Sequence, residues 1–324
     1  MTTRIRLLSA FLAVMGPLAT AARAGDPPSA PTKQAVAKEK PVYDEKADAA
    51  KDIAAAVARA EKNHSRVLVQ WGANWCGWCR MLHATAQSDK PIAKELHDEY
   101  EVVHVDVGRF DKHMELAAKY GADLKKEGLP YLTVIGGDDK AVANQETASL
   151  ELPKDAQAKG HDATKVLAFL KANEAPRVKA DDVLAAGIAR AKAEGKLVFL
   201  HFGAPWCGWC HKLEAWMAKP DVARILGNAF VDVKVDTDRM PGGQELLRAH
   251  SQGKNGGIPW FEFLDADGKA LANSNAPKGG NIGFPAQPDE IAWFAEMLRA
   301  SKARMSEKEI SELGDSLRSK PSAP

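Results

Sequence analysis

The chain has 324 residues, of which 45% are hydrophobic and 27% are charged. That length allows two hydrophobic cores of ordinary domain size, and that polarity excludes a protein that lies mainly within a bilayer. Lysine and arginine number 44 against 43 aspartate and glutamate residues, so the formal net charge is only +1. This balance gives the protein no charge attraction for nucleic acid or for an anionic membrane surface.

The first residues have the layout of a secretory signal peptide. Arg4 and Arg6 precede an apolar run over 7–19, and residues 22–24 then supply the small side chains of a cleavage site. The run is short against the roughly 20 residues that a spanning helix needs. We therefore predict a cleaved signal over 1–24 rather than a membrane anchor, and a mature protein that is periplasmic or secreted and not membrane-spanning.

The first half of the chain predicts alternating helices and strands. Apolar residues recur with helical spacing in some segments and form short runs rich in β-branched residues in others. Residues 25–43, which contain four prolines, are predicted to be a flexible tether. Gly136-Gly137 turns one strand into a return strand near Val142. Helices are expected over 49–62, 76–88, 91–99, 111–120 and 162–173, and strands over 67–72, 102–107 and 130–135.

The second half repeats this order after a boundary near Glu174 to Arg177, where the helical pattern is interrupted. Asp267-Gly268 is the expected hairpin turn. Residues 305–324 are interpreted as a C-terminal tail, with a solvated helix in the charge-rich part over 306–320. Helices are expected over 181–194, 207–218, 244–251 and 288–300, and strands over 196–203, 231–236 and 259–264. Each half thus predicts an α/β layered fold around a mixed sheet.

An internal sequence repeat links the two halves. Val-Leu-Val-Gln-Trp-Gly-Ala-Asn-Trp-Cys-Gly-Trp-Cys ends at Cys79, and Val-Phe-Leu-His-Phe-Gly-Ala-Pro-Trp-Cys-Gly-Trp-Cys ends at Cys210, an offset of 131 residues. The four cysteines of the chain form two local pairs, Cys76 with Cys79 and Cys207 with Cys210. No cysteine remains for a cross-link between distant segments, which is where a disulfide restricts the unfolded chain most. The cysteines therefore indicate reactive sites rather than structural cross-links.

Each cysteine pair stands at the expected start of a helix. There the free backbone N–H groups and the helix dipole stabilise a thiolate, so Cys76 and Cys207 are the predicted attacking thiols. Cys79 and Cys210 follow one turn later, close enough to attack the mixed disulfide that forms. The pattern predicts nucleophilic thiol–disulfide exchange that requires no organic cofactor and no metal.

These residues resemble the thioredoxin superfamily, in which a strand ending in Gly-Ala leads into Trp-Cys-x-x-Cys and a proline opens the next hairpin. The resemblance covers roughly 44–300. One Cys-x-x-Cys is weak evidence for this family, whereas two in this setting are strong. The resemblance implies the α/β fold class with two tandem thioredoxin-like folds, each a mixed β-sheet flanked by helices, over 44–175 and 178–304.

The resemblance also implies substrate-contacting positions. They are the tryptophan before each cysteine pair, the proline that matches the family's cis-proline, and the residue before it, whose backbone would pair with a substrate peptide. An ordinary loop-to-strand proline is the alternative. Tyr131 and Trp260, which follow the prolines, either contact substrate or cover the core. The implied positions are Trp75, Leu129 and Pro130 in the first copy and Trp206, Ile258 and Pro259 in the second.

The sequence departs from the family pattern at two places. Typical thioredoxins carry a buried acid six residues before the first cysteine, but this chain has Gln70 and His201 there. An imidazole takes up a proton near neutral pH and an amide does not, so His201 is a predicted catalytic base, with a satisfied core histidine as the alternative. The Gly-Trp between the cysteines is typical neither of reducing nor of oxidising members, so the direction of electron flow stays open.

The sequence thus predicts an exported protein-disulfide oxidoreductase that acts on disulfide- or thiol-containing protein substrates. We favour a reductase, because a Trp-Cys-Gly start is commoner among reducing members of the family. No later stretch approaches 18 uninterrupted apolar residues, so a membrane-borne electron donor or acceptor must be a separate protein.

Other interpretations of the function remain open beside the reductase. They include a disulfide oxidase or isomerase and a redox-inert client-binding module. A remote alternative is a c-type haem protein, because Cys207-Gly-Trp-Cys210-His211 formally matches the haem attachment motif, although Arg80 replaces the histidine in the first copy. A four-cysteine zinc site would have to unite both pairs.

Overall fold

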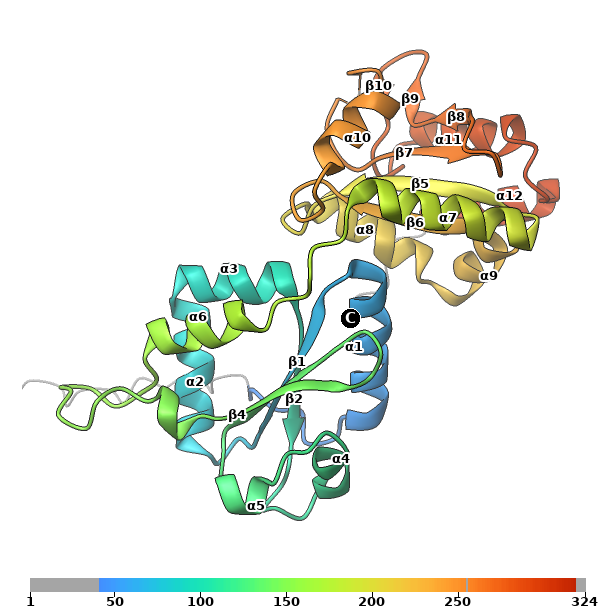
Figure 1. Cartoon of the computed structure of the whole chain (residues 1–324). Coiled ribbons are helices and arrows are strands. Elements are labelled where there is room, and N and C mark those ends of the chain that lie inside the picture. Colours follow the sequence, from blue (N-terminus) through green and yellow to red (C-terminus); the bar gives the residue numbers. More distant parts are fainter. Residues whose placement is uncertain (1–40, 255, 319–324) are drawn as a thin grey trace, which may run out of the picture. The chain divides into compact units, whose positions relative to one another are not determined.

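Figure 1 shows the computed structural model, which describes residues 41–254 and 256–318. Within these ranges the strands form two four-stranded mixed sheets and one two-stranded sheet. The predicted α/β fold class, with two mixed sheets flanked by helices, is confirmed. The expected signal peptide and residues 25–40 of the expected tether lie outside the described residues.

The first sheet has the strand order β2-β1-β3-β4. β1 (Arg66–Gly72) lies inside it, parallel to β2 (Tyr100–Asp106) and antiparallel to β3 (Tyr131–Ile135). β4 (Ala141–Glu146) returns antiparallel to β3 at the edge. The parallel pair requires a crossover, which α2 (Gly77–Ser88) and α3 (Lys90–Glu99) supply. The cysteine pair therefore stands where the inner strand β1 gives way to this crossover.

Helices cover both faces of the first sheet, because alternate residues of its strands point to opposite sides. Val67, Val69 and Trp71 pack on the side of α1 (Ala49–Asn63), whereas Leu68 packs with α2, α3 and α6 (Ala163–Ala172). Two short elements were not predicted, α5 (Leu124–Glu127) and the 3-10 turn η1 (Ala148–Leu150).

One helix of the first half is shorter than expected. The helix predicted over 111–120 is α4 (Met114–Lys119). Phe110 and His113 have positive φ angles of 65° and 56°, in the left-handed region that an α-helix excludes. The chain therefore turns before the helix can begin, and the prediction for residues 111–113 is wrong.

The second sheet repeats the topology with the order β6-β5-β7-β8. β5 (Leu197–Gly203) pairs parallel with β6 (Phe230–Asp236) and antiparallel with β7 (Trp260–Leu264), and β8 (Ala270–Asn273) lies at the edge. α7 (Ala180–Glu194) and α10 (Gly243–His250) pack on one face. α8 (Gly208–Met217), α9 (Pro220–Ala229) and α11 (Pro288–Ala300) pack on the other.

Several parts of the second half differ from the prediction. α9 was not predicted, although Pro220 at its first turn suits a helix start. The two-stranded hairpin of β9 (Asn275–Ala276) and β10 (Gly280–Asn281) was also missed. The helix expected to be solvated, α12 (Glu307–Arg318), is amphipathic, and its apolar face joins the core beside α11. The buried side chains of that face are Ile310, Leu313 and Leu317.

Candidate redox sites

Each cysteine pair lies at the N-terminus of a helix and is joined as a disulfide. Cys76 is the N-cap residue of α2, and the backbone N–H of Cys79 donates to Cys76 Sγ over 3.1 Å. Cys207 caps α8 in the same way, with the Cys210 N–H donating to Cys207 Sγ over 3.1 Å. When the pair is reduced, this amide and the helix dipole favour negative charge on the first sulfur.

The two cysteines of a pair are both buried and differ slightly in their exposure to solvent. Cys79 is 0% exposed and Cys210 is 2% exposed, whereas Cys76 and Cys207 retain 6% and 5%. The first cysteine of each pair is therefore slightly more accessible than the second.

The structure brings the predicted proline segments to the disulfides. The peptide bonds Leu129–Pro130 and Ile258–Pro259 are both cis. Leu129 packs against the first pair, and Ile258 packs against the second. The carbonyl oxygen of Ile258 lies 3.6 Å from Cys207 Sγ. The residue before each cis-proline thus stands beside the sulfurs, as a strand-like substrate contact would require.

Exposed tryptophans flank both sites. Trp75 is 47% and Trp206 is 63% exposed, and each indole N–H is anchored, to the Gly108 carbonyl over 2.7 Å and to Asp238 Oδ2 over 2.6 Å respectively. Tethered, solvent-facing aromatic rings suit contacts with a partner chain. Tyr131 and Trp260 are only 6% and 0% exposed and pack in the hydrophobic core clusters, which favours the alternative that they cover the core.

His201 is a buried and partnered residue of the second half. It is 1% exposed, and its Nε2 lies 2.9 Å from Asp232 Oδ1. Asp232 also pairs with Lys62. Burial opposes ionisation of Asp232, but its contacts with His201 and Lys62 outweigh this effect and hold the pKa of this carboxyl below its ordinary value.

The residue matched to His201 makes different contacts in the first half. Gln70 is 5% exposed, and its Nε2 donates to Tyr43 Oη over 2.8 Å and lies 3.5 Å from the Cys79 carbonyl oxygen. Tyr43 is 1% exposed and packs with Cys76 and Cys79. Sequence reasoning placed Tyr43 at the end of a tether. The available signal was that it is the single aromatic residue in 25–43, six residues before the start of the first helix.

Three histidines lie near the first site without a predicted role. The ring of His104 lies 5.7 Å from Tyr43 and 5.3 Å from His83, and burial together with His83 lowers the pKa of His104 to about 4. His161 stands edge-on to Trp78 with ring centroids 5.6 Å apart, and burial lowers its pKa to about 4. His104 and His161 are therefore neutral near pH 7.

The haem alternative does not fit the second site. His211 Nε2 lies 2.5 Å from the Pro205 carbonyl oxygen, and Arg80 Nη1 donates to the matching Asn74 carbonyl over 2.7 Å. Both side chains thus close the loop before their cysteine pair, and His211 is turned toward the backbone rather than free to act as an axial ligand. In the described part of the chain, no group of three or more histidine, cysteine or acidic side chains is placed to hold a metal ion.

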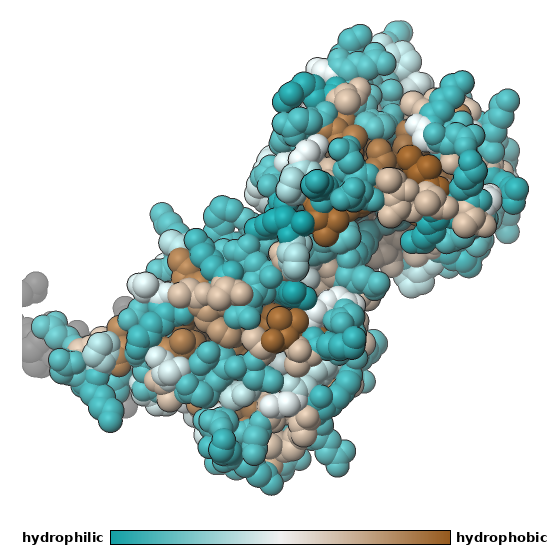
Figure 2. All heavy atoms as spheres, in the orientation of Figure 1, coloured by the Kyte–Doolittle hydropathy of each residue, from teal (hydrophilic) through white to brown (hydrophobic). Residues whose placement is uncertain are grey.

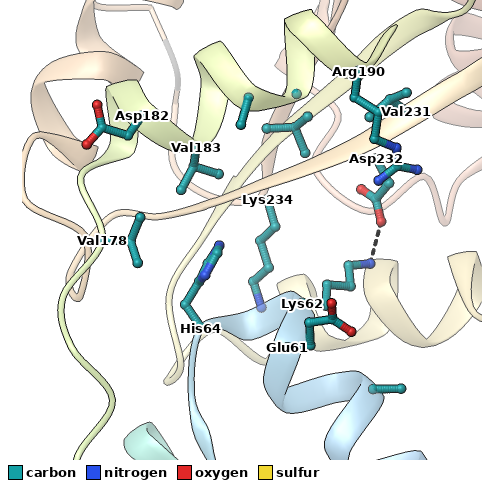
Figure 3. A pocket seen from close by; sticks show the side chains of 14 residues that line it. Glu61, Lys62, His64, Val178, Asp182, Val183, Arg190, Val231, Asp232 and Lys234 are labelled. Carbon is teal, nitrogen blue, oxygen red and sulfur yellow. Dashed lines mark ion pairs between the residues drawn. The ribbon is translucent and has the colours of Figure 1, made fainter. Parts of the chain in front are cut away.

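The surface away from the disulfides carries a separate hollow, shown in Figure 3. Its volume is about 590 Å³, and residues of α1, α7 and β6 line it, among them the ion pair of Lys62 with Asp232. No cysteine lines it, so it belongs to neither site.

On the face drawn in Figure 2, hydrophilic residues predominate and hydrophobic ones form small separate patches. No helix within 41–254 and 256–318 combines the length and apolar content needed to cross a membrane.

Comparison with known proteins finds relatives for both halves. A family model described as Thioredoxin-like matches residues 48–136. A second model, Thioredox_DsbH, described as a protein of unknown function (DUF255), matches residues 161–317. Among solved structures, a disulphide isomerase from Xylella fastidiosa is 29% identical with a TM-score of 0.36, covering 41% of this chain and 97% of that one.

Two curated proteins match shorter stretches. The thiol:disulfide interchange protein DsbD of Vibrio cholerae is 34% identical over 92 residues, which are 28% of this chain and 15% of that protein. The uncharacterized protein B0495.5 of Caenorhabditis elegans is 31% identical over 103 residues, 30% of this chain and 14% of that protein. The chain therefore spans about a seventh of the length of either relative. Residues 48–136 are thus similar to thioredoxin-like proteins and residues 161–317 to the Thioredox_DsbH family, and each matched stretch contains one Cys-x-x-Cys disulfide.

Proposed function

We propose that the protein is an exported disulfide reductase with two tandem thioredoxin-like domains, over 44–175 and 178–304, each with its own redox site. The observation that carries the proposal is the geometry around each disulfide. A helix N-terminus directs an amide at the first sulfur, and a cis-proline segment presents backbone beside the pair. Export rests on the signal-like residues 1–24, which lie outside the described residues.

In the proposed reaction, the reduced protein donates two electrons to a substrate disulfide. The thiolate of Cys76 or Cys207 attacks one substrate sulfur, a mixed disulfide forms, and the other substrate sulfur leaves as a thiol after taking up a proton. Cys79 or Cys210 then loses its proton and attacks the mixed disulfide. The protein is left with an internal disulfide, and the substrate leaves as a dithiol. A membrane-borne donor must return two electrons to start the next cycle.

The substrate contacts in this proposal are the exposed and backbone-presenting groups at each site. Trp75 and Trp206 would cover the substrate beside the attacking sulfur, and the segments at Leu129–Pro130 and Ile258–Pro259 would pair with its backbone. His201 would accept the proton of Cys210. Support for that role comes from β5, where alternate residues share a face, so that His201 lies on the same side as Gly203, which stands against Cys210.

The test is the turnover of a protein disulfide by the full chain, such as the reduction of insulin with dithiothreitol as the electron source. We expect turnover by the wild type and by each variant that keeps one pair, C76S/C79S or C207S/C210S. We expect no acceleration over dithiothreitol alone when all four cysteines are serine. Acceleration that does not require the cysteines would refute the proposal, and oxidation of reduced RNase by the disulfide form without acceleration of insulin reduction would favour the oxidase direction.

A further inference from the structure

Tyr43 fills a place in the first site that is empty at the second. A Cβ built on Gly72 would lie 2.2 Å from Tyr43 Oη and 2.9 Å from Cys79 Sγ, so the phenol oxygen and the resolving sulfur border the same point. A Cβ built on the matching Gly203 would meet only atoms of Cys210 within 4 Å. The two redox sites therefore differ beside the second cysteine.

The position of Tyr43 is fixed through its backbone. The Tyr43 N–H donates to Asn74 Oδ1 over 3.0 Å, and Asn74 Nδ2 donates to the Tyr43 carbonyl over 2.9 Å. Asn74 also donates to Glu45 Oε1 over 3.1 Å. The second copy has Pro205 in place of Asn74, and its residue at the Tyr43 offset is Glu174, which pairs with Arg177 instead. The sequence difference thus matches the structural one.

The hydroxyl of Tyr43 is also oriented. It accepts a hydrogen bond from Gln70 Nε2 over 2.8 Å, so its own proton is left to donate elsewhere. Gln70 replaces the acid of typical thioredoxins and offers no proton acceptor of that kind. An uncharged donor beside a sulfur has one effect on its chemistry, which is to stabilise the thiolate over the thiol.

We propose that Tyr43 assists the resolving step of the first site, its hydroxyl stabilising the Cys79 thiolate while that sulfur attacks the mixed disulfide at Cys76. This inference rests on the proposed function. In the step, Cys79 releases its proton to solvent, the bond between Cys79 and Cys76 forms, and the bond between Cys76 and the substrate breaks. The electron pair leaves with the substrate sulfur, which then takes up a proton.

The groups around Tyr43 do not remove the proton of its phenol, so the hydroxyl stays a hydrogen-bond donor. His104 faces it from β2 and is uncharged near pH 7, and His83 lies behind His104 on α2. Asp106 acts on Tyr43 through its charge, and Lys112 Nζ lies 3.4 Å from that carboxylate. Burial raises the pKa of Tyr43 well above its ordinary value, so the phenol stays protonated wherever thiols exchange.

The test reads the two chemical steps of the first site separately. The full chain carrying C207S/C210S is reduced, then mixed with the aromatic disulfide of thionitrobenzoate. One thionitrobenzoate is released when Cys76 attacks and a second when Cys79 resolves the mixed disulfide. We expect Y43F to slow the second phase about tenfold at pH 7, the size that one hydrogen bond to a charged group gives. We also expect its pH midpoint to move upward, with the first phase unchanged.

Matched variants separate this role from a structural one. Y120F removes a hydroxyl that is bonded to Asp139 and Lys119 instead, and it should leave both phases unchanged. Q70M removes the donor that orients the phenol and should slow the second phase, which also covers the case in which Y43F does not fold. A second phase in Y43F and Q70M as fast as in Y120F would overturn the proposal. Absence of any second phase in the parent chain would instead refute the proposed function.

Discussion

Gly72 and Gly203 occupy matching positions four residues before the two cysteine pairs, and they offer a matched test of the packing around the sites. At Gly72 an alanine Cβ would fall 2.2 Å and 2.5 Å from the hydroxyl oxygen and the ring carbon of Tyr43. Tyr43 must then move and lose the hydrogen bond from Gln70. At Gly203 the nearest atoms are Cys210 Cβ and Sγ at 3.2 Å and 3.3 Å, which a small shift relieves.

The expected magnitudes follow from these contacts. Overpacking a core costs about 1–3 kcal/mol, and leaving the buried Gln70 amide without the Tyr43 hydroxyl costs about 1–3 kcal/mol more, so G72A should destabilise its half by about 2–6 kcal/mol. G203A should cost about 1 kcal/mol. Native-state hydrogen exchange on peptides from β1 and β5 measures each half within the intact chain. A loss of protection in G72A no larger than that in G203A would refute this account of the packing.

Three further predictions concern stability and proton transfer. Burial lowers the pKa of His104 from 6.5 in the unfolded chain to about 4 in the folded one, so its contribution to stability is complete above pH 6.5 and is lost as the pH falls toward 4. Between pH 7 and pH 4.5, H104Q should therefore lose about 2–3 kcal/mol less of its free energy of unfolding than the wild type does. Urea unfolding at the two pH values measures this, and equal losses would contradict it. L313A should destabilise the second half by about 2–5 kcal/mol because Leu313 is 0% exposed in the core, whereas E312A should have no effect; equal unfolding midpoints would show that α12 does not support the core. H201Q in the C76S/C79S chain should slow resolution by Cys210 about tenfold or more without changing the attack by Cys207, and unchanged resolving rates would remove His201 from the mechanism.

The elements around each site could be predicted because their signals are local. The helix at Ala49, the strand before Cys76 and the helix that the cysteine opens each show a periodicity within their own residues. The repeat at Cys207 then predicted the second sheet in the same way. Hairpin prolines could be placed beside the cysteines only through the resemblance to thioredoxins.

The remaining features depend on contacts between distant residues. Tyr43 meets Gln70, which is 27 residues later, and a proline-rich segment gives no local sign of that contact. His201 finds Asp232 on the neighbouring strand, and nothing near His201 in the sequence indicates its partner. α12 has a strongly charged composition, so its buried face at Ile310 and Leu313 is visible only as a helical spacing among charges. Such features need the folded chain.

The central claim is that each Cys-x-x-Cys pair is an independent dithiol–disulfide couple poised for reduction of substrates. It is tested most directly by the reduction potential of each pair, measured in full chains carrying C207S/C210S or C76S/C79S. The chains are equilibrated in glutathione buffers, and the alkylated thiols are counted by mass. We expect an internal disulfide in both chains, with potentials of about −270 mV. Potentials of about −120 mV would contradict the reductase direction, and failure of a pair to form its disulfide would contradict redox activity in that half.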